Sequence, residues 1–212
     1  MGPGQYFDAD PVVTSRLGQV ELRLGDQTLT LSVDRGVFSA GRVDPGTLAL
    51  LRASPPPPAA GSLCDLGCGY GPIACTLARR SPGATVWALD VNRRALALVE
   101  ANARSLGLTN VRVAHPDDVP ADLGFAGIWS NPPIRIGKEP LHRLLGTWLA
   151  RLDGDARAWL VVHQHLGGDS LAAWMGAEGY GVRRAASKRG YRILEVTPGA
   201  AAGGEATPGA AP

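Results

Sequence analysis

Strand-like and helix-like segments alternate along the chain from Ser62 onward, and this alternation constrains the fold more than any other feature. Short apolar runs such as SLCDLG, TVWALDV and GFAGIWSN are typical of buried strands. Between them, segments such as NRRALALVEANARSLG have helical spacing, and Gly107 is typical of a helix end. Helical crossovers between parallel strands must cover both faces of the sheet. The pattern therefore predicts an α/β fold with a doubly wound, mainly parallel sheet.

The last two predicted strands narrow this class. YGVRRAAS and YRILEV are joined only by Lys188, Arg189 and Gly190. A connection this short cannot be a parallel crossover, so the final strand must run antiparallel to its neighbour. We expect a mainly parallel sheet with one antiparallel C-terminal strand.

The segments on either side of this unit have different patterns. QVELRLGDQTLTLSV alternates apolar and polar residues around Gly25 and Asp26, which predicts a β-hairpin. A loop and a short helix follow, and then the stiff spacer PPPPAAG. The C-terminal stretch is low-complexity Gly, Ala and Pro, which predicts disorder. We expect a hairpin extension over 1–54 packed on a main domain over 62–196, and a disordered tail over 197–212.

Composition excludes a few classes of function. No apolar run approaches the length that spans a bilayer, and MGPGQYFDAD lacks the regions of a signal peptide, so we expect a cytoplasmic protein. The cysteines at 64, 68 and 75 have no CxxC spacing, so we expect packed thiols and no metal site. A formal net charge of +2 neither requires nor excludes a nucleic-acid partner.

A glycine-rich turn, DLGCGYG (65–71), joins the first strand of the main unit to its first helix. Gly67, Gly69 and Gly71 allow the backbone to approach a ligand closely at a helix N-terminus. The GxGxG spacing is one residue shorter than the GxGxxG turn of dinucleotide-binding proteins. Asp65, at the strand end, suits a ligand with a cationic end. S-adenosylmethionine has an ammonium and a sulfonium group and no phosphate, so the motif predicts its binding site.

Further polar residues follow the next two strands. Asp90 ends the second strand, where a carboxylate can bind both ribose hydroxyls; its other possible role is to cap the following helix. We assign Asn92, in the same ALDVN segment, to the same binding site. Asp117 follows the third strand and is a candidate acceptor for an adenine amino group, although Asp118 competes for that role.

The stretch SNPPI ends the fourth strand, next to the point where open α/β sheets bind their ligands. The side-chain oxygen of Asn131 and a backbone carbonyl can both accept hydrogen bonds, while Pro132 and Pro133 stiffen the backbone and add no donor. Two converging acceptors fit an NH₂ group, and holding both N–H bonds turns the nitrogen lone pair toward the methyl group of a sulfonium. We therefore predict that these three residues are catalytic; a simple turn after the strand is the alternative.

In this order and spacing, DLGCGYG, ALDVN and SNPPI resemble the motifs of class I methyltransferases that modify exocyclic or amide nitrogens. The segments QYFD, LTLSVDRGVFSAGRVDPGT and NPPIRIGKEPLHRLL are similar to the small-domain family that includes bacterial small-subunit rRNA guanine-N2 methyltransferases, the RsmC-like proteins. GKEPLHRLL and KRGYRIL resemble a compact, single-domain branch. The resemblance covers residues 5–196. It implies the class I methyltransferase fold and S-adenosylmethionine as donor, with Gly67, Gly69, Asp90 and Asp117 around the donor and Asn131 at the target nitrogen.

The chain departs from this pattern at Ile134, where many amino-methyltransferases carry a Phe or Tyr that stacks on the target ring. Phe38, in GVFS, is our candidate for a replacement stacking platform, and a place in the core under the hairpin is the alternative.

Basic residues are predicted on both sides of the target site. Arg135 and Lys138 follow the Asn-Pro-Pro motif, and Lys188, Arg189 and Arg192 lie at the final hairpin. Strand direction brings that turn to the same edge of the sheet, where both groups could contact phosphates beside an extruded base. Solvated arginines in an Arg-rich sequence are the alternative.

These features together predict an enzyme that transfers a methyl group from S-adenosylmethionine to an exocyclic amine. The leading substrate is guanine N2 in RNA of the 16S rRNA type. A protein glutamine amide and a small-molecule amine remain open, as does a non-catalytic RNA-binding module that retains the fold. The intact Asn-Pro-Pro motif argues against the last, because a binding module needs no pair of acceptors beside a cofactor pocket.

Overall fold

The computed structural model describes residues 14–37 and 41–199. Its strands are β1 (Leu17–Arg23), β2 (Thr28–Asp34), β3 (Gly61–Leu66), β4 (Ala84–Leu89), β5 (Val111–Ala114), β6 (Phe125–Ser130), β7 (Leu152–His163), β8 (Gly181–Lys188) and β9 (Tyr191–Thr197). Its α-helices are α1 (Pro45–Ala53), α2 (Pro72–Arg80), α3 (Arg93–Ser105), α4 (Lys138–Leu149) and α5 (Gly168–Ala177). Short 3₁₀ turns are η1 (Pro116–Asp118), η2 (Ile134–Ile136) and η3 (Gln164–Leu166).

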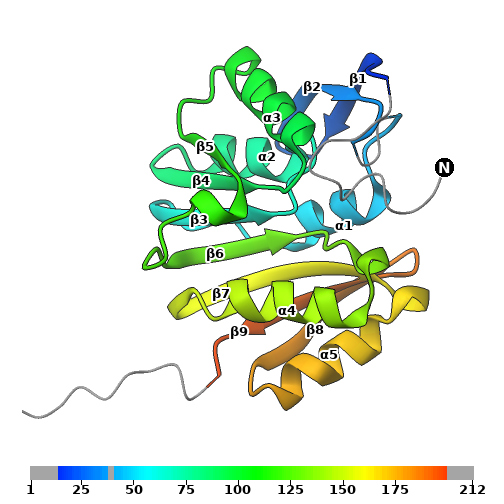
Figure 1. The fold of residues 1–212 in the computed structure, drawn as a ribbon, viewed down its shortest axis with the longest axis vertical. Helices are drawn as coiled ribbons and strands as arrows, with labels where there is room; N and C mark the ends of the chain where they lie inside the picture. The colour runs from blue at the N-terminus through cyan, green and yellow to red at the C-terminus, as the bar shows by residue number, and fades with distance from the viewer. Residues whose placement is uncertain (1–13, 38–40, 200–212) are drawn as a thin grey trace, which may run out of the picture.

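A seven-stranded sheet in the order β5-β4-β3-β6-β7-β9-β8 forms the centre of the molecule (Figure 1). Strands β3 to β7 pair in parallel, and β9 runs antiparallel to both of its neighbours, β7 and β8. The predicted doubly wound sheet with one reversed C-terminal strand is therefore confirmed. The chain moves outward from β3 through β4 to β5 and then returns to β6, so the topological switch point lies between β3 and β6.

The sheet has a hydrophobic layer on each face. Side chains from α1, α2 and α3 pack with the hairpin β1–β2 on one face, and side chains from α4 and α5 pack on the other. Within β6, Trp129 belongs to the first layer and the adjacent Ile128 to the second, as expected for a strand buried on both faces. This arrangement leaves the carboxyl ends of the parallel strands as the edge where a site can form.

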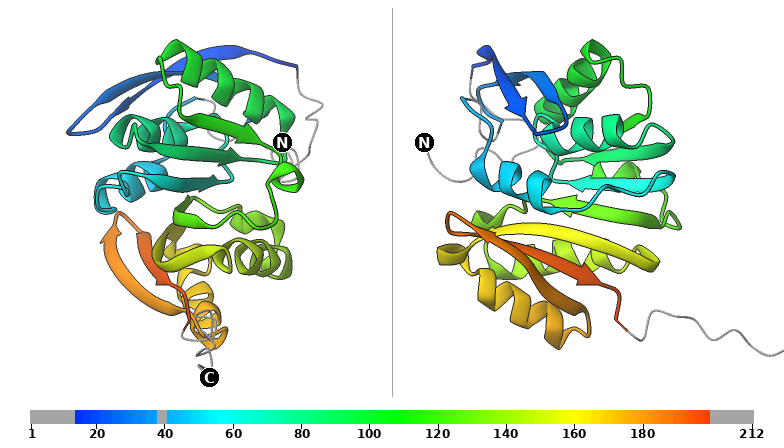
Figure 2. Two further views of the ribbon diagram at one scale, coloured as in Figure 1. Left: turned by 90° about the vertical axis from the view of Figure 1, so that its left-hand side faces the viewer. Right: turned by 180° about the vertical axis from the view of Figure 1, so that it is seen from behind.

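The N-terminal hairpin β1–β2 lies outside the main sheet, alongside α3 (Figure 2). Asn102 of α3 joins the two parts: its Oδ1 accepts from the Ser32 N–H at 2.7 Å, and its Nδ2 donates to the Ser32 carbonyl at 3.0 Å. The same Nδ2 donates to the Tyr70 carbonyl in the glycine-rich turn at 2.8 Å. One buried amide thus connects the hairpin, α3 and the predicted cofactor turn.

Helix α1 and the proline spacer connect the hairpin to β3. Asp44 is the N-cap of α1 and accepts from the Thr47 N–H at 2.9 Å, with Pro45 in the first turn, where a missing N–H costs little. Helix α1 then packs against β7 and β9. The extension therefore contacts the main sheet close to the carboxyl end of β6.

Three further sequence predictions can be placed. Thr197, assigned to the tail, is the last residue of β9, and residues 200–212 lie outside the described part of the chain. All three cysteines are buried and unbridged. Among the described residues, no cluster of His, Cys, Asp and Glu has the arrangement of a metal site, and no helix is long and apolar enough to cross a membrane.

Candidate active site

The candidate site lies where the carboxyl ends of β3, β4 and β6 meet. Leu66, the last residue of β3, pairs with Leu89 of β4 on one side and with Ser130 of β6 on the other. The Ser130 hydroxyl donates to the Leu66 carbonyl at 2.7 Å and is fully buried. Asn131 is therefore held beside the glycine-rich turn that begins at Gly67.

The three glycines of this turn all have left-handed backbones, with φ of 76° at Gly67, 54° at Gly69 and 88° at Gly71. They differ in their surroundings. A Cβ on Gly71 would lie 3.1 Å from both methyl groups of Val99, so this glycine allows α2 to pack on α3. A Cβ on Gly67 would meet no atom within 4 Å among the described residues. Gly67 therefore presents open backbone to which a ligand can come close.

Asp65 is a fully buried acid below this turn. Its Oδ2 accepts from the Ala74 N–H in the first turn of α2 at 2.8 Å, and its Oδ1 has no hydrogen-bond partner within the described chain. Burial raises the pKa of Asp65 to about 8; the Ala74 hydrogen bond opposes this rise and the charge of Asp90 adds to it. Contact between this carboxyl group and the ammonium group of S-adenosylmethionine stays a prediction.

Asp90 holds the turn to the end of β4. Its Oδ2 accepts from the Gly69 N–H and its Oδ1 from the Asn92 N–H, both at 2.9 Å. Burial raises the pKa of Asp90, and these N–H groups counteract part of the rise. The helix-capping role considered for Asp90 belongs instead to Asn92, whose Oδ1 accepts from the N–H groups of Arg94 and Ala95.

Asn92 is almost completely buried, and its Nδ2 also donates to the Gly36 carbonyl at 3.3 Å. The oxygen and the nitrogen of this amide thus both form hydrogen bonds within the protein, so Asn92 supports the backbone around the site. Contact between its side chain and a cofactor stays a prediction.

Asp117 lies at the rim of the site, in η1 after β5. It is exposed, and its Oδ2 lies 3.4 Å from His115 Nδ1. Asp118 is exposed as well, so the choice between the two acids as adenine acceptor stays open.

Asn131 is held by two residues that the sequence analysis did not select. Its Nδ2 donates to Asp44 Oδ1 at 2.9 Å and to Thr47 Oγ1 at 3.1 Å, both at the start of α1. The sequence VDPGT predicts a helix start, but it contains no signal that links it to an asparagine 87 residues away. The side-chain oxygen of Asn131 has no partner within the described chain.

The two prolines after Asn131 lead into a tight turn. The Pro132 carbonyl accepts from the Ile134 N–H at 2.8 Å, and the Pro133 carbonyl accepts from the Ile136 N–H at 3.1 Å. Because a carbonyl oxygen has two lone pairs, the Pro132 carbonyl retains capacity for a second donor. Ile134 packs against the α4 side of the sheet, and Phe38, the candidate stacking residue, lies outside the described residues.

The predicted basic residues lie at the same edge of the sheet. Arg135 is in η2 and Lys138 begins α4, and both are exposed. Lys188 and Arg189 are exposed at the turn between β8 and β9, which the Gln164 N–H holds beside the end of β7 by bonding to the Gly190 carbonyl at 2.7 Å. Arg189 is the only non-glycine residue with positive φ, 50°, in the described chain.

One neighbour of the turn between β8 and β9 differs from expectation. Arg192 forms an ion pair with Asp169, so it is engaged within the protein.

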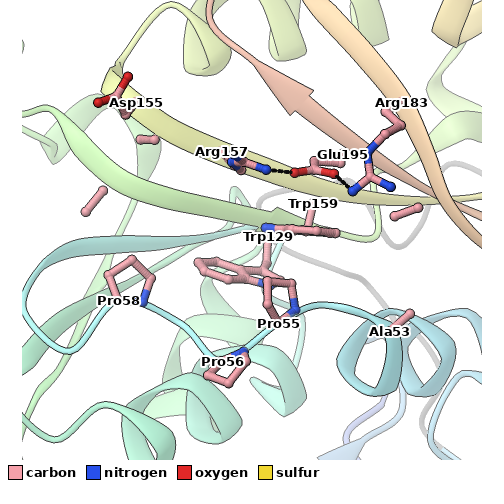
Figure 3. Close-up of a pocket in the computed structure, with 13 residues that line it drawn as sticks. Ala53, Pro55, Pro56, Pro58, Trp129, Asp155, Arg157, Trp159, Arg183 and Glu195 are labelled. Carbon is pink, nitrogen blue, oxygen red and sulfur yellow. Dashed lines mark hydrogen bonds and ion pairs between the residues drawn. The ribbon is translucent and has the colours of Figure 1, made fainter.

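A cavity of about 570 Å³ lies away from these residues, between the proline spacer and the strands β6, β7, β8 and β9 (Figure 3). Trp129 and Trp159 line it, and Glu195 pairs with Arg157 and Arg183 along its wall. None of the predicted site residues lines this cavity. The candidate active site is therefore the open edge around Gly67 and Asn131.

Comparisons with known proteins identify the family of the chain. The family model described as methyltransferase small domain matches residues 28–195. The Bacillus subtilis protein YbxB, described as uncharacterized, is 33% identical over 90% of this chain and 96% of its own length. The Aeromonas hydrophila ribosomal RNA small subunit methyltransferase C is 37% identical over 70% of this chain, which corresponds to 42% of that protein.

A solved structure from T. thermophilus, a 16S rRNA N2 guanine methyltransferase (RsmC) in complex with AdoMet and guanosine, has a TM-score of 0.73 with 25% identity. The match covers 87% of this chain and 51% of that one. A ribosomal protein L11 methylase from Lactobacillus delbrueckii, with a TM-score of 0.58 and 18% identity, shares the fold. The chain thus spans nearly all of YbxB but about half or less of the two rRNA methyltransferases.

Proposed function

The chain belongs to the methyltransferase small domain family and is an S-adenosylmethionine-dependent enzyme with the class I methyltransferase fold, and we propose that it methylates an exocyclic amine, guanine N2 of RNA. The observation that carries the proposal is the environment of Asn131. Its Nδ2 is bonded within the protein, so the side chain offers an acceptor oxygen beside the glycine-rich turn. An exocyclic amine is a donor of the matching kind.

The donor side of the site follows from the residues around the turn. Asp65 and the open backbone at Gly67 would bind the amino acid end of the donor, and Asp90 would face the ribose. The bound donor supplies an electrophilic methyl group on a positively charged sulfur. Without the donor, burial raises the pKa of Asp65 to about 8 and favours the protonated acid; the positive charge of the ammonium group would lower this pKa and favour the carboxylate.

The residues after β6 would orient the acceptor. Asn131 Oδ1 and the Pro132 carbonyl accept the two N–H bonds of the target amine and turn its lone pair toward the methyl group. As the C–N bond forms and the C–S bond breaks, the amine becomes cationic and releases one proton to solvent. Alignment contributes more than basicity here, because the positive sulfur makes the leaving group good.

RNA as the substrate class is supported by the basic residues on two sides of the site and by the names of the rRNA methyltransferase relatives. Lys188 and Arg189 would contact phosphates on one side, and Arg135 and Lys138 on the other. An extruded guanine could then enter between them. We infer that this RNA is small-subunit ribosomal RNA.

The test is to incubate the protein with methyl-labelled S-adenosylmethionine and separate pools of 16S rRNA, 23S rRNA, tRNA, protein and small molecules. Label in 16S rRNA that nuclease digestion assigns to N2-methylguanosine is the expected result. Label on protein glutamine or on a small amine would overturn the substrate and keep the reaction. Donor binding in calorimetry without transfer to any pool would favour a binding module.

A further inference from the structure

We propose that Asp44 and Thr47 are positioning residues that fix the amide of Asn131 so that its oxygen faces the target amine. This inference rests on the proposed function, since it concerns the residue that would hold the substrate nitrogen. It also assigns a role at the site to the N-terminal extension.

The contacts define one orientation of the amide. Both hydrogens of Asn131 Nδ2 have acceptors at the start of α1, Asp44 Oδ1 at 2.9 Å and Thr47 Oγ1 at 3.1 Å. A flipped amide would bring Oδ1 against the Asp44 carboxylate, which has no hydrogen to donate. The flipped form would therefore lose the charge-assisted bond and place two acceptors in contact.

Orientation decides whether the amide can act on an amine. An amino group of a base presents N–H bonds, so it needs an oxygen opposite it. With the amide flipped, Nδ2 would meet the target amine as a second donor. The lone pair of the target nitrogen stays aligned with the methyl group only if the Asn131 amide keeps one orientation through the reaction.

The two acceptors are themselves held rigidly. Asp44 Oδ1 also accepts from the Thr47 N–H at 2.9 Å, and Thr47 is only 4% exposed. A Cβ on Gly46 would lie 2.7 Å from the ring of Tyr191 and 2.9 Å from Asp44 Oδ1, so this turn fits closely between β9 and the asparagine. Neither acceptor can follow the amide if it rotates.

The first experiment compares Thr47→Val with Thr47→Ser. Valine keeps the shape and the backbone N–H that Asp44 caps, but it removes the acceptor oxygen; serine keeps the oxygen. We expect Thr47→Val to lower kcat about tenfold, the effect of one hydrogen bond, and Thr47→Ser to stay near wild type. Affinity for S-adenosylmethionine and KM for RNA should be unchanged in both. Equal kcat for the valine and wild-type proteins would overturn the proposal, as would a matching loss of donor affinity.

A second comparison uses Asp44→Asn and Asp44→Ala. Asparagine retains an oxygen that can accept from Asn131, whereas alanine retains none and also removes the cap of α1. We expect near wild-type kcat for Asp44→Asn and a fall of at least tenfold for Asp44→Ala beyond any loss of folded protein measured by thermal unfolding. Activity of Asp44→Ala equal to that of Asp44→Asn would contradict the inference.

A readout independent of catalysis separates this inference from the proposed function. The side-chain ¹⁵N–¹H signals of Asn131, assigned by their loss in Asn131→Ala, should shift and exchange faster with solvent in Thr47→Val but not in Thr47→Ser. That result without any methyl transfer would refute the proposed function and keep the positioning role. Unchanged signals in Thr47→Val would refute the positioning role whatever the activity.

Discussion

Two parts of the site are built in different ways: the donor side, which would hold the methyl donor, and the acceptor side, which would hold the target amine. On the donor side, Asp65 accepts from Ala74, 9 residues away, and Asp90 accepts from Gly69 and Asn92, 21 and 2 residues away, so these partners lie near one another along the chain. On the acceptor side, Asn131 is held by residues 84 and 87 positions earlier in the chain. A local turn can be recognised from its motif, whereas the acceptor site depends on how the extension docks.

The largest effect is expected from a substitution that disrupts only the acceptor side. Asn131→Ala should lower kcat by about 10²–10³-fold, because it removes a fixed polar group that would orient the reacting amine. Affinity for S-adenosylmethionine should change by less than about threefold, since the turn around Asp65 and Gly67 does not use this side chain. Single-turnover kinetics and calorimetric titration measure the two quantities. If donor affinity fell as far as the rate, Asn131 would belong to the donor side.

On the donor side, the buried acid should make the stability of the ligand-free protein depend on pH. The pKa of Asp65 is raised to about 8, so between pH 4 and 8 the folded protein retains a proton that the unfolded chain releases. Stability should therefore fall as pH rises through this window. Thermal unfolding should show a decrease of several degrees, and Asp65→Asn should reduce this decrease. An identical pH profile in the variant would show that another group is responsible.

Substitutions in the basic turn between β8 and β9 test whether RNA binds next to the acceptor side. Changing both Lys188 and Arg189 to Ala should weaken RNA binding about tenfold at moderate salt, with affinity for S-adenosylmethionine unchanged. The slope of log K against log salt concentration should fall by an amount that corresponds to about two fewer ions released on binding. Arg104→Ala is the matched control, because this exposed arginine lies in the last turn of α3 at the opposite edge of the sheet. Equal losses from both variants would indicate a general charge effect.

The smallest effect concerns the backbone of the same turn. Arg189 has a left-handed conformation that costs a non-glycine residue roughly 1 kcal/mol, so Arg189→Gly should raise the thermal midpoint by about 2–4 °C. Lys188→Ala should leave the midpoint unchanged. A gain in stability accompanied by weaker RNA binding would indicate that an arginine is kept there for its charge. A lower midpoint in Arg189→Gly would contradict this explanation.

Sequence patterns predicted much of the fold because its signals are local. Strand and helix periods identified the parallel sheet, and the short connection at Lys188 identified the reversed strand. The same reasoning located the glycine-rich turn and the position of Asn131. It did not assign the helix cap to Asn92, because Asp90 and Asn92 both lie shortly before a helix starting at Arg93. The role of both residues in donor binding stays a prediction.

Pairings between distant segments could not be read from the sequence. Nothing in VDPGT distinguishes an ordinary helix start from one that also binds an asparagine in another strand. In the same way, the engagement of Arg192 by Asp169 depends on how α5 packs beside β9. Docking of the extension was expected, and the residues that achieve it, Asn102 and Ser32 among them, became visible only in three dimensions.

The proline spacer between α1 and β3 separates the two halves of the acceptor site along the chain. Asp44 and Thr47 lie before it and Asn131 lies after it, so the covalent connection keeps the two halves at a high effective concentration. Cleavage within Pro55-Pro56-Pro57-Pro58 would convert an intramolecular contact into a bimolecular one. The two fragments would then form an active enzyme only by complementation, with a rate that depends on their dilution.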